Sequence, residues 1–261
     1  MRVFLDGPPD SQALPALRDA LQPLKYIEVV SQPTLCNIQV RETGGNLETL
    51  GADSSTRSTP VPLSDANAVS RVVEQLKQWA RWFSVLSIRN AQSDINVSFA
   101  LKGHQTRDPM ARVGRPDMGV TEGEIIDATL TNNYERDLYV AILDLSSDGS
   151  VAVVYPAEGS QAVLKPGTSL TRSLKPSVPK GRSSVTDALK VFASVKPIDL
   201  RPLTQGQIRG LDDDTATDDP LQQLLNDASG TTRSIEVVSN GPTDLGSWTT
   251  AQRVLVIRRA Q

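Results

Sequence analysis

Cys36 and His104 are the first residues to consider for chemistry, because each is the only one of its type in the chain. A histidine can take the proton of a cysteine and so turn the thiol into a nucleophile. Neither residue has a suitable context here. Cys36 precedes a predicted strand with no glycine-rich turn that could form an oxyanion hole, and His104 lies in a predicted loop. We expect Cys36 to pack as a small apolar residue, and the sequence predicts no catalytic residue.

One cysteine and one histidine also exclude a thiolate cluster or a site of several histidines. Carboxylates of the acidic run could hold Ca²⁺, but the run lacks the spacing, the central glycine and the final glutamate of an EF-hand loop. We therefore predict no metal and no cofactor, and interpret this run as an exposed loop open to proteolysis or protein contact. The predicted loop residues are Arg209, Asp212, Asp213, Asp214, Asp218 and Asp219.

Positive charges gather near turns in the second half of the chain, at Lys165, Lys175, Lys180 and Arg182. They could form a basic patch, but ordinary surface charge is the favoured interpretation. The whole chain has 27 Lys and Arg against 30 Asp and Glu, a net charge of −3. This balance favours neither nucleic acid nor an anionic membrane as a partner, and no phosphate-binding loop motif occurs.

The N-terminal residues are not expected to form a signal peptide, because the stretch is short and soon acidic. No apolar run reaches the roughly 20 residues that a membrane-spanning helix needs. The chain as given is therefore expected to be soluble and cytoplasmic, unless it is part of a longer protein. Its apolar fraction of 38% and aromatic fraction of 4% predict a mainly aliphatic core.

The strongest structural signal is a β-hairpin within Asp137–Pro156. Two apolar runs, Leu138–Leu145 and Val151–Tyr155, flank a turn that contains Asp148 and Gly149. Asp-Gly suits a tight antiparallel turn, and continuous apolar runs suit strands that are covered on both faces. This hairpin is predicted to form the centre of a packed sheet.

Residues 1–92 are predicted to form a small α/β domain of short strands covered by two helices. The first helix starts near Ser11 and carries leucines at helical spacing up to Leu24. The second is expected to start at Ser64, with an apolar stripe from Val69 to Phe83. Trp79 flanks this stripe and is expected to pack on the sheet.

Residues 93–261 are predicted to form an Ig-like antiparallel β-sandwich, which makes the whole chain an α+β protein. About eight short strands follow one another at intervals marked by turns. Two of them, Ile95–Leu101 and Glu124–Thr131, alternate apolar with polar residues as half-buried strands do. A short helix is expected at Pro220–Ala228, and a further strand at Ser234–Ser239.

The second half resembles a domain of unknown function that occurs C-terminal to caspase-like peptidase domains in bacteria. The resemblance covers roughly residues 95–261 and concerns the order of strands and turns. It depends on Val120–Glu124, Leu130–Asn132, Leu138–Val140, Val154–Pro156, Leu164–Gly167, Leu189–Ser194 and Val254–Ile257. No peptidase domain is present, so the resemblance implies an accessory module and not a protease.

We therefore expect a non-catalytic protein that contacts a protein partner, with a caspase-like peptidase as the implied partner. The chain would be its regulator, its scaffold or its proteolytic target. The alternative is a cell-envelope module that binds a small ligand or a glycan through the sandwich. The low aromatic content disfavours glycan stacking.

Overall fold

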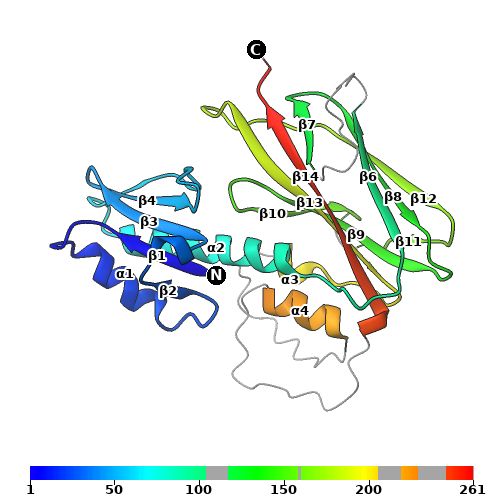
Figure 1. Cartoon of the computed structure of the whole chain (residues 1–261), viewed down its shortest axis with the longest axis horizontal. Coiled ribbons are helices and arrows are strands. Elements are labelled where there is room, and N and C mark those ends of the chain that lie inside the picture. The colour runs from blue at the N-terminus through cyan, green and yellow to red at the C-terminus, as the bar shows by residue number, and fades with distance from the viewer. Residues whose placement is uncertain (104–116, 158–159, 205–218, 229–244, 261) are drawn as a thin grey trace. The chain divides into compact units, whose positions relative to one another are not determined.

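A computed structural model describes residues 1–103, 117–157, 160–204, 219–228 and 245–260 of the chain (Figure 1). The chain divides into two compact units. The N-terminal unit comprises Met1–Ser87 together with Asp148–Ser150, and the C-terminal unit comprises Ile88–Ser147 and Val151–Gln261. The sequence predicts a boundary shortly after this one, between residues 92 and 93.

The N-terminal unit has a five-stranded sheet in the order β2-β1-β3-β4-β5. Strands β1, β2 and β3 run parallel, while β4 and β5 add an antiparallel extension. Its elements are β1 (Arg2–Asp6), α1 (Ala13–Leu21), β2 (Glu28–Val30), η1 (Pro33–Leu35, a 3-10 helix), β3 (Ile38–Thr43), β4 (Asn46–Gly51), β5 (Val61–Pro62) and α2 (Ala68–Ser87).

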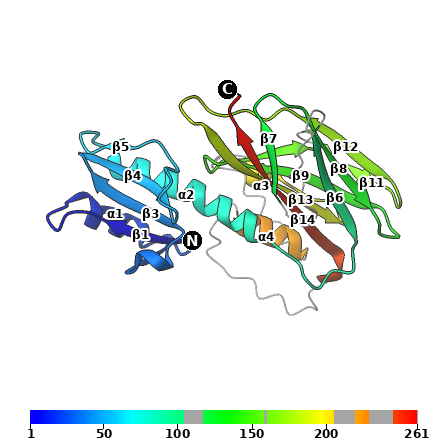
Figure 2. The same ribbon diagram turned by 45° about the horizontal axis from the view of Figure 1, so that its top comes forward.

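One face of this sheet packs against both helices (Figures 1 and 2). Because side chains alternate along a strand, Val3 of β1 and both Ile38 and Val40 of β3 point to the same side. All three are completely buried, as are Leu17 of α1 and Leu76 of α2. The small α/β fold with two helices thus follows from the periodicities of two and 3.6 residues that the sequence shows.

The start of α1 agrees with the prediction, whereas the start of α2 does not. The Ser11 hydroxyl accepts the N–H of Leu14 at 3.0 Å, as expected of a residue that caps α1. The predicted start of the second helix at Ser64 is wrong, because a turn comes first. Asp65 accepts the N–H of Asn67 at Oδ1 and that of Ala68 at its carbonyl, both at 2.9 Å, so α2 begins at Ala68.

The C-terminal unit is built mainly of two sheets. A six-stranded sheet has the order β10-β9-β13-β14-β7, with β11 also paired to β9, and a three-stranded sheet has the order β12-β8-β6. The elements are β6 (Val97–Gly103), β7 (Asp117–Thr121), β8 (Ile126–Asn132), β9 (Leu138–Leu145), β10 (Val151–Tyr155), β11 (Val163–Leu164), β12 (Ser169–Leu174), β13 (Ser184–Ser194), α3 (Arg201–Thr204), α4 (Pro220–Ala228), η2 (Leu245–Ser247) and β14 (Trp248–Arg258).

The two sheets pack face to face around an aliphatic core (Figure 1). Phe99 and Leu130 of the small sheet meet Val140, Ile142 and Val191 of the large one. The predicted hairpin is present as β9 and β10, but only β9 lies inside the sheet, between β10 and β13. β10 is an edge strand with half-buried and exposed residues, so the prediction that both strands are central is wrong for β10. The chain is therefore a sheet-rich α+β protein.

Further elements of the C-terminal unit can be compared with the sequence-based prediction. β7 runs parallel to β14, so the large sheet is mixed and not purely antiparallel. β7 spans Asp117–Thr121, just before the predicted strand Glu124–Thr131. The strand predicted at Ser234–Ser239 lies outside the described residues. The helix predicted at Pro220–Ala228 is present as α4.

Among the helices that can be described, none combines the length and apolarity required to cross a membrane.

Candidate functional site

Of the two residues that first suggested chemistry, the structure describes only Cys36. Cys36 is buried, as predicted, and its Sγ lies 3.1 Å from the carbonyl oxygen of Pro33, to which the thiol donates. His104 lies outside the described residues. Within the described ranges, no group of three or more His, Cys, Asp or Glu side chains is placed to hold a metal ion.

The predicted interaction loop is described only at its last residue. Asp219 caps α4, because its carboxylate accepts the N–H of Leu221 and its carbonyl accepts that of Gln223, both at 3.0 Å. A helix cap is a structural role that the acidic run did not suggest. The other predicted loop residues, Arg209, Asp212, Asp213, Asp214 and Asp218, lie outside the described residues.

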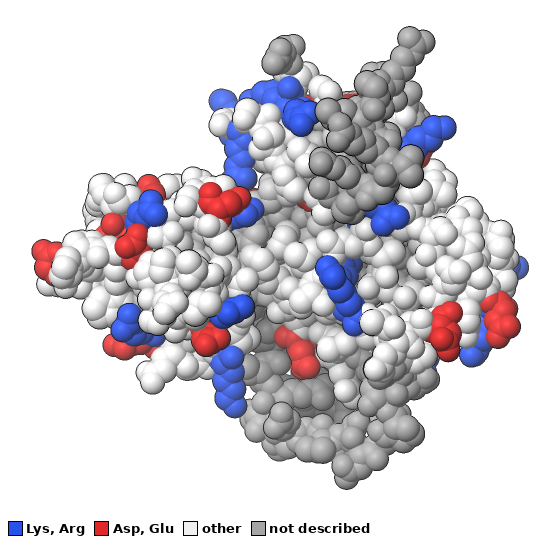
Figure 3. All heavy atoms as spheres, viewed as in Figure 1, with Lys and Arg blue, Asp and Glu red and all other residues white. Residues whose placement is uncertain are grey.

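The basic residues of the second half do not form one patch. Lys165 precedes β12 and Lys175 follows it, so a strand that spans roughly 20 Å separates the two. Lys180 and Arg182 lie in the turn before β13. Positive and negative side chains are interspersed on the face drawn in Figure 3. Ordinary surface charge, the favoured interpretation, agrees with this placement.

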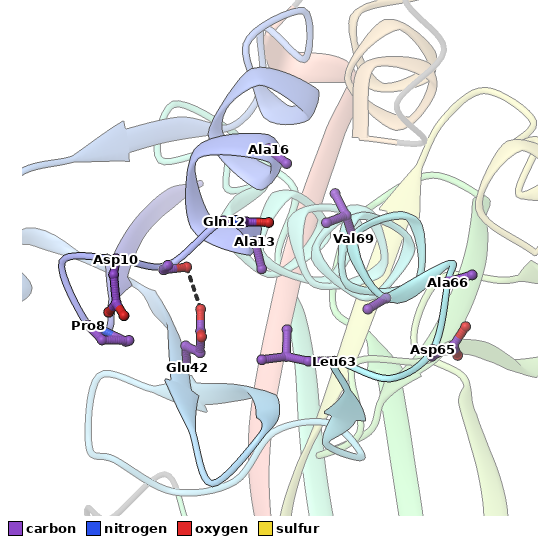
Figure 4. Close-up of a pocket in the computed structure, with 12 residues that line it drawn as sticks. Pro8, Asp10, Gln12, Ala13, Ala16, Glu42, Leu63, Asp65, Ala66 and Val69 are labelled. Carbon is purple, nitrogen blue, oxygen red and sulfur yellow. Dashed lines mark hydrogen bonds between the residues drawn. The ribbon is translucent and has the colours of Figure 1, made fainter.

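A groove in the N-terminal unit is the most developed candidate site (Figure 4). It has a volume of about 530 Å³, and it is bounded by the loop after β1, the N-terminal turn of α1, the end of β3 and the segment that leads into α2. Apolar and acidic side chains share its lining, which comprises Pro8, Asp10, Ser11, Gln12, Ala13, Ala16, Glu42, Leu63, Asp65, Ala66, Ala68 and Val69.

The topology of the sheet explains why a groove opens here. From β1 the chain passes through α1 to β2 on one side, whereas from β3 it turns to β4 on the other side. The connections after two adjacent parallel strands therefore diverge at the carboxyl ends of β1 and β3. In open α/β sheets, ligands bind in the crevice that such a divergence leaves.

Two residues shape the floor of the groove at this point. Glu42 follows Ile38 and Val40 at the same alternation, so its side chain projects from the face of the sheet that the helices cover. Gly7 directly follows the adjacent strand β1 and lies close to both Leu14 of α1 and Glu42 of β3. A Cβ atom at Gly7 would lie 2.8 Å from Leu14 Cδ1 and 2.9 Å from Glu42 Cβ. Only glycine allows this close approach of α1 to β3.

The Ser11 hydroxyl connects the two sides of the groove. It donates a hydrogen bond to Glu42 Oε2 and accepts the N–H of Leu14, which fixes the end of β3 against the first turn of α1 (Figure 4). A carboxylate and a hydroxyl in contact could suggest a nucleophile and its base. Here the hydroxyl accepts a main-chain N–H of α1, and Glu42 accepts the proton of the hydroxyl. Both bonds therefore serve to cap the helix, which is a structural role.

The polar lining of the groove is acidic. Asp65 forms an ion pair with Arg71 at 2.7 Å, and the hydrogen bond from Arg71 holds the pKa of Asp65 below its usual value. Asp10 is exposed at the opposite end, and Glu42 lies between them in Figure 4. No lysine, arginine or histidine is among the described residues that line the groove. The site is therefore suited to a positively charged group.

This groove was not predicted from the sequence. The available signal was the alternation Ile38, Val40, Glu42, which places a carboxylate in line with core residues, beside a serine that caps a helix. The pairing of β1 with β3, which brings these parts together, has no local signature.

A buried lysine in the C-terminal unit was not predicted from the sequence either. Lys190 lies in the middle of β13 and is only 1% exposed, and its Nζ donates to the carbonyl of Ile88 at 2.5 Å. Burial lowers the pKa of Lys190 to about 8, and the nearby charge of Arg89 acts in the same direction. The Phe192 ring centroid lies 5.9 Å from Nζ. Because the amine is enclosed and bonded to the main chain, we regard it as structural.

Comparison with known proteins does not add a family to these observations. No family model matches the chain, and no curated protein is similar to it. The link to caspase-associated accessory domains therefore stays a prediction.

Proposed function

We propose that this chain is a non-catalytic accessory protein that binds a protein partner, and that the partner is a caspase-like peptidase. The order of strands and turns in residues 95–261 supports the choice of partner. We infer in addition that the C-terminal unit is an Ig-like sandwich, an inference supported by its two sheets with a shared core. Such a module would act by contact and not by chemistry.

The groove of the N-terminal unit is the observation that carries the binding role. It lies where the connections after two parallel strands diverge, and it combines an apolar lining with carboxylates. A volume of about 530 Å³ is large enough for a few side chains of a partner. A groove of this kind anchors part of a protein surface, as interfaces generally do through a small number of filled pockets.

Co-purification from the native host tests the proposal. The tagged chain should retain a peptidase encoded near its own gene, and the same peptidase should be absent when an unrelated protein carries the tag. Repeated recovery of the chain without any peptidase would contradict the proposal. The envelope module that binds a ligand or a glycan would then be the better explanation.

Incubation with the purified peptidase separates the possible roles. A cut in residues 206–219, mapped by the masses of the fragments, would identify the chain as a target or a processed effector. Stable binding without a cut would identify it as a regulator or a scaffold. Replacement of Arg209 together with Asp212, Asp213 and Asp214 should abolish cleavage at that loop if it is the target.

A further inference from the structure

We propose that the groove between α1 and the end of β3 binds a lysine or arginine side chain of an extended partner segment, flanked by small apolar residues. This inference deepens the proposed function and depends on it for the nature of the partner. It assigns the groove a specific chemistry, the recognition of a single basic side chain.

The charge of the lining supports a cationic occupant. Arg71 balances Asp65, whereas Asp10 and Glu42 face the groove with no basic residue among the described lining residues. Glu42 is half-buried, so a charge beside it is less screened than a charge on an open surface. A guanidinium or an ammonium group that reaches Glu42 would balance the negative charge of its carboxylate.

The apolar part of the lining supports a long aliphatic stem below that charge. Ala13 and Ala16 of α1 face Val69 of α2 and Leu63 across the groove (Figure 4). Lysine and arginine bury their methylene groups on apolar surfaces while the charged head stays polar. Ala13 and Ala16 leave room for this stem. Small residues on both sides of the partner's lysine or arginine would let the partner's backbone lie close to the groove.

An anion is the wrong occupant for the same site. Helix N-termini commonly bind phosphate through free N–H groups. At α1, the Ser11 hydroxyl already accepts the N–H of Leu14, and the carboxylate of Glu42 contacts that hydroxyl. A phosphate would meet Glu42 and Asp10 at short range and would be repelled.

Titration of the full chain with short peptides tests the inference directly. The probe is an acetylated pentapeptide of alanine with one central arginine, followed by ¹H–¹⁵N spectra of the labelled protein. We expect saturable shifts for the amides of Ala13, Ala16 and Val69. Peptides with central glutamate or norleucine should give much weaker binding, because they lack the positive charge.

Paired variants decide whether the groove is responsible. Glu42→Gln should weaken binding of the arginine peptide by up to about fivefold, the upper end of the range for loss of one exposed charge pair. Ala16→Trp should block the groove without a change of charge. The matched controls are Glu48→Gln, on the adjacent strand but the opposite face of the sheet, and Asp19→Asn, an exposed residue of α1. Both should leave binding unchanged.

The inference is overturned if the arginine peptide gives no saturable shift, or if Ala16→Trp and the controls bind it equally well. This result is independent of the test of function. A peptidase that co-purifies equally with wild type and Ala16→Trp would leave the accessory function intact and remove only the groove from it. Peptide binding without any peptidase partner would support the groove and contradict the proposed partner.

Discussion

Lys190 reaches from the middle of a central strand to the main-chain carbonyl of Ile88, to which its Nζ donates at 2.5 Å. This contact connects β13 with the chain segment that enters the C-terminal unit at Ile88. A lysine that is 1% exposed keeps its charge at a cost, since burial disfavours the ionised form. The lowered pKa of Lys190, about 8, is the consequence.

The stability of the protein should therefore depend on pH through Lys190. The folded pKa of about 8 lies below the reference value of 10.5, so the unfolded chain binds more protons between these pH values. Stability should rise with pH across this window, by about 1.4 kcal/mol per unit, and the contribution should be constant at lower pH. Urea unfolding of wild type and Lys190→Met from pH 7 to 10 measures this difference.

The comparison with Lys190→Met removes the background from other titrating groups. The stability of wild type relative to this variant should increase from pH 8 upwards. Lys175→Met, which replaces an exposed lysine in the same way, serves as the matched control. A difference between wild type and Lys190→Met that stays constant over the whole range would contradict the prediction.

Asn132→Ala should destabilise the C-terminal unit strongly. The Asn132 side chain is fully buried, donates to the carbonyls of Arg136 and Leu164 at 2.8 Å each, and accepts the N–H of Tyr134 at 2.9 Å. The variant leaves three buried or partly buried main-chain groups without this partner. We expect a loss of roughly 3 kcal/mol in the free energy of unfolding.

The neighbouring Asn133 is the control for this variant. Asn133 is exposed, and its side-chain amide donates to Ser98 Oγ. Asn133→Ala should cost less than about 1 kcal/mol in chemical denaturation. Equal losses in the free energy of unfolding for the two variants would show that the buried hydrogen bonds of Asn132 contribute no more than the exposed bond of Asn133.

Arg172→Val should increase the rate of aggregation and lower the free energy of unfolding only slightly. Arg172 pairs with Ala128 across the sheet and so lies on the face of β12 that points to the core, with its guanidinium 4.3 Å from the Tyr155 ring centroid. β12 is an edge strand, and a charge that points inward from an edge opposes pairing with another chain. Loss of the cation–π contact should cost about 1 kcal/mol.

Light scattering at moderate heating measures this effect. Arg172→Val should aggregate faster than wild type at a temperature where both remain folded, and Arg172→Lys should behave as wild type does. Arg136→Val, a change at an exposed turn residue, controls for the loss of one surface charge. Identical scattering for Arg172→Val and Arg136→Val would argue against a protective role at this edge.

Gly7→Ala should strain the N-terminal unit, because the new Cβ would lie within 3 Å of both Leu14 Cδ1 and Glu42 Cβ. Overpacking of this kind costs about 1–3 kcal/mol. At Gly119, a new Cβ would meet no atom of the described residues within 4 Å, so Gly119→Ala should be nearly neutral. Thermal unfolding of the two variants compares a crowded glycine with an uncrowded one. Equal midpoint temperatures would contradict the close approach of Gly7 to Leu14 and Glu42.

Most strands and helices could be predicted from the sequence, since their signals are local. Asp148 and Gly149 marked the turn of the central hairpin, and the apolar runs on both sides became β9 and β10. Short elements such as β5 and β11 were missed, because two residues carry too little pattern. The start of α2 was misplaced at Ser64, because the chain first forms a turn at Asp65 and the helix begins only at Ala68.

The candidate site could not be predicted in the same way. The groove requires β1 to pair in parallel with β3, which places Gly7 beside Glu42. The two paired segments are far apart in the chain, since Arg2 and Asn37, which share a hydrogen bond there, are 35 residues apart. No local pattern encodes which strands become neighbours. The residues with obvious chemistry, Cys36 and His104, drew attention instead, and Cys36 proved to be buried.

The sequence by itself determined the sheet-rich character of this protein, the central hairpin and the amphipathic helices, because side-chain periodicity is a property of neighbouring residues. Only the tertiary structure decided that Lys190 is buried and that Glu42, Ser11 and Ala16 share one groove. Burial and proximity depend on contacts between distant segments. Those contacts are set by the packing of whole sheets and helices, and so they become visible only when the chain is folded.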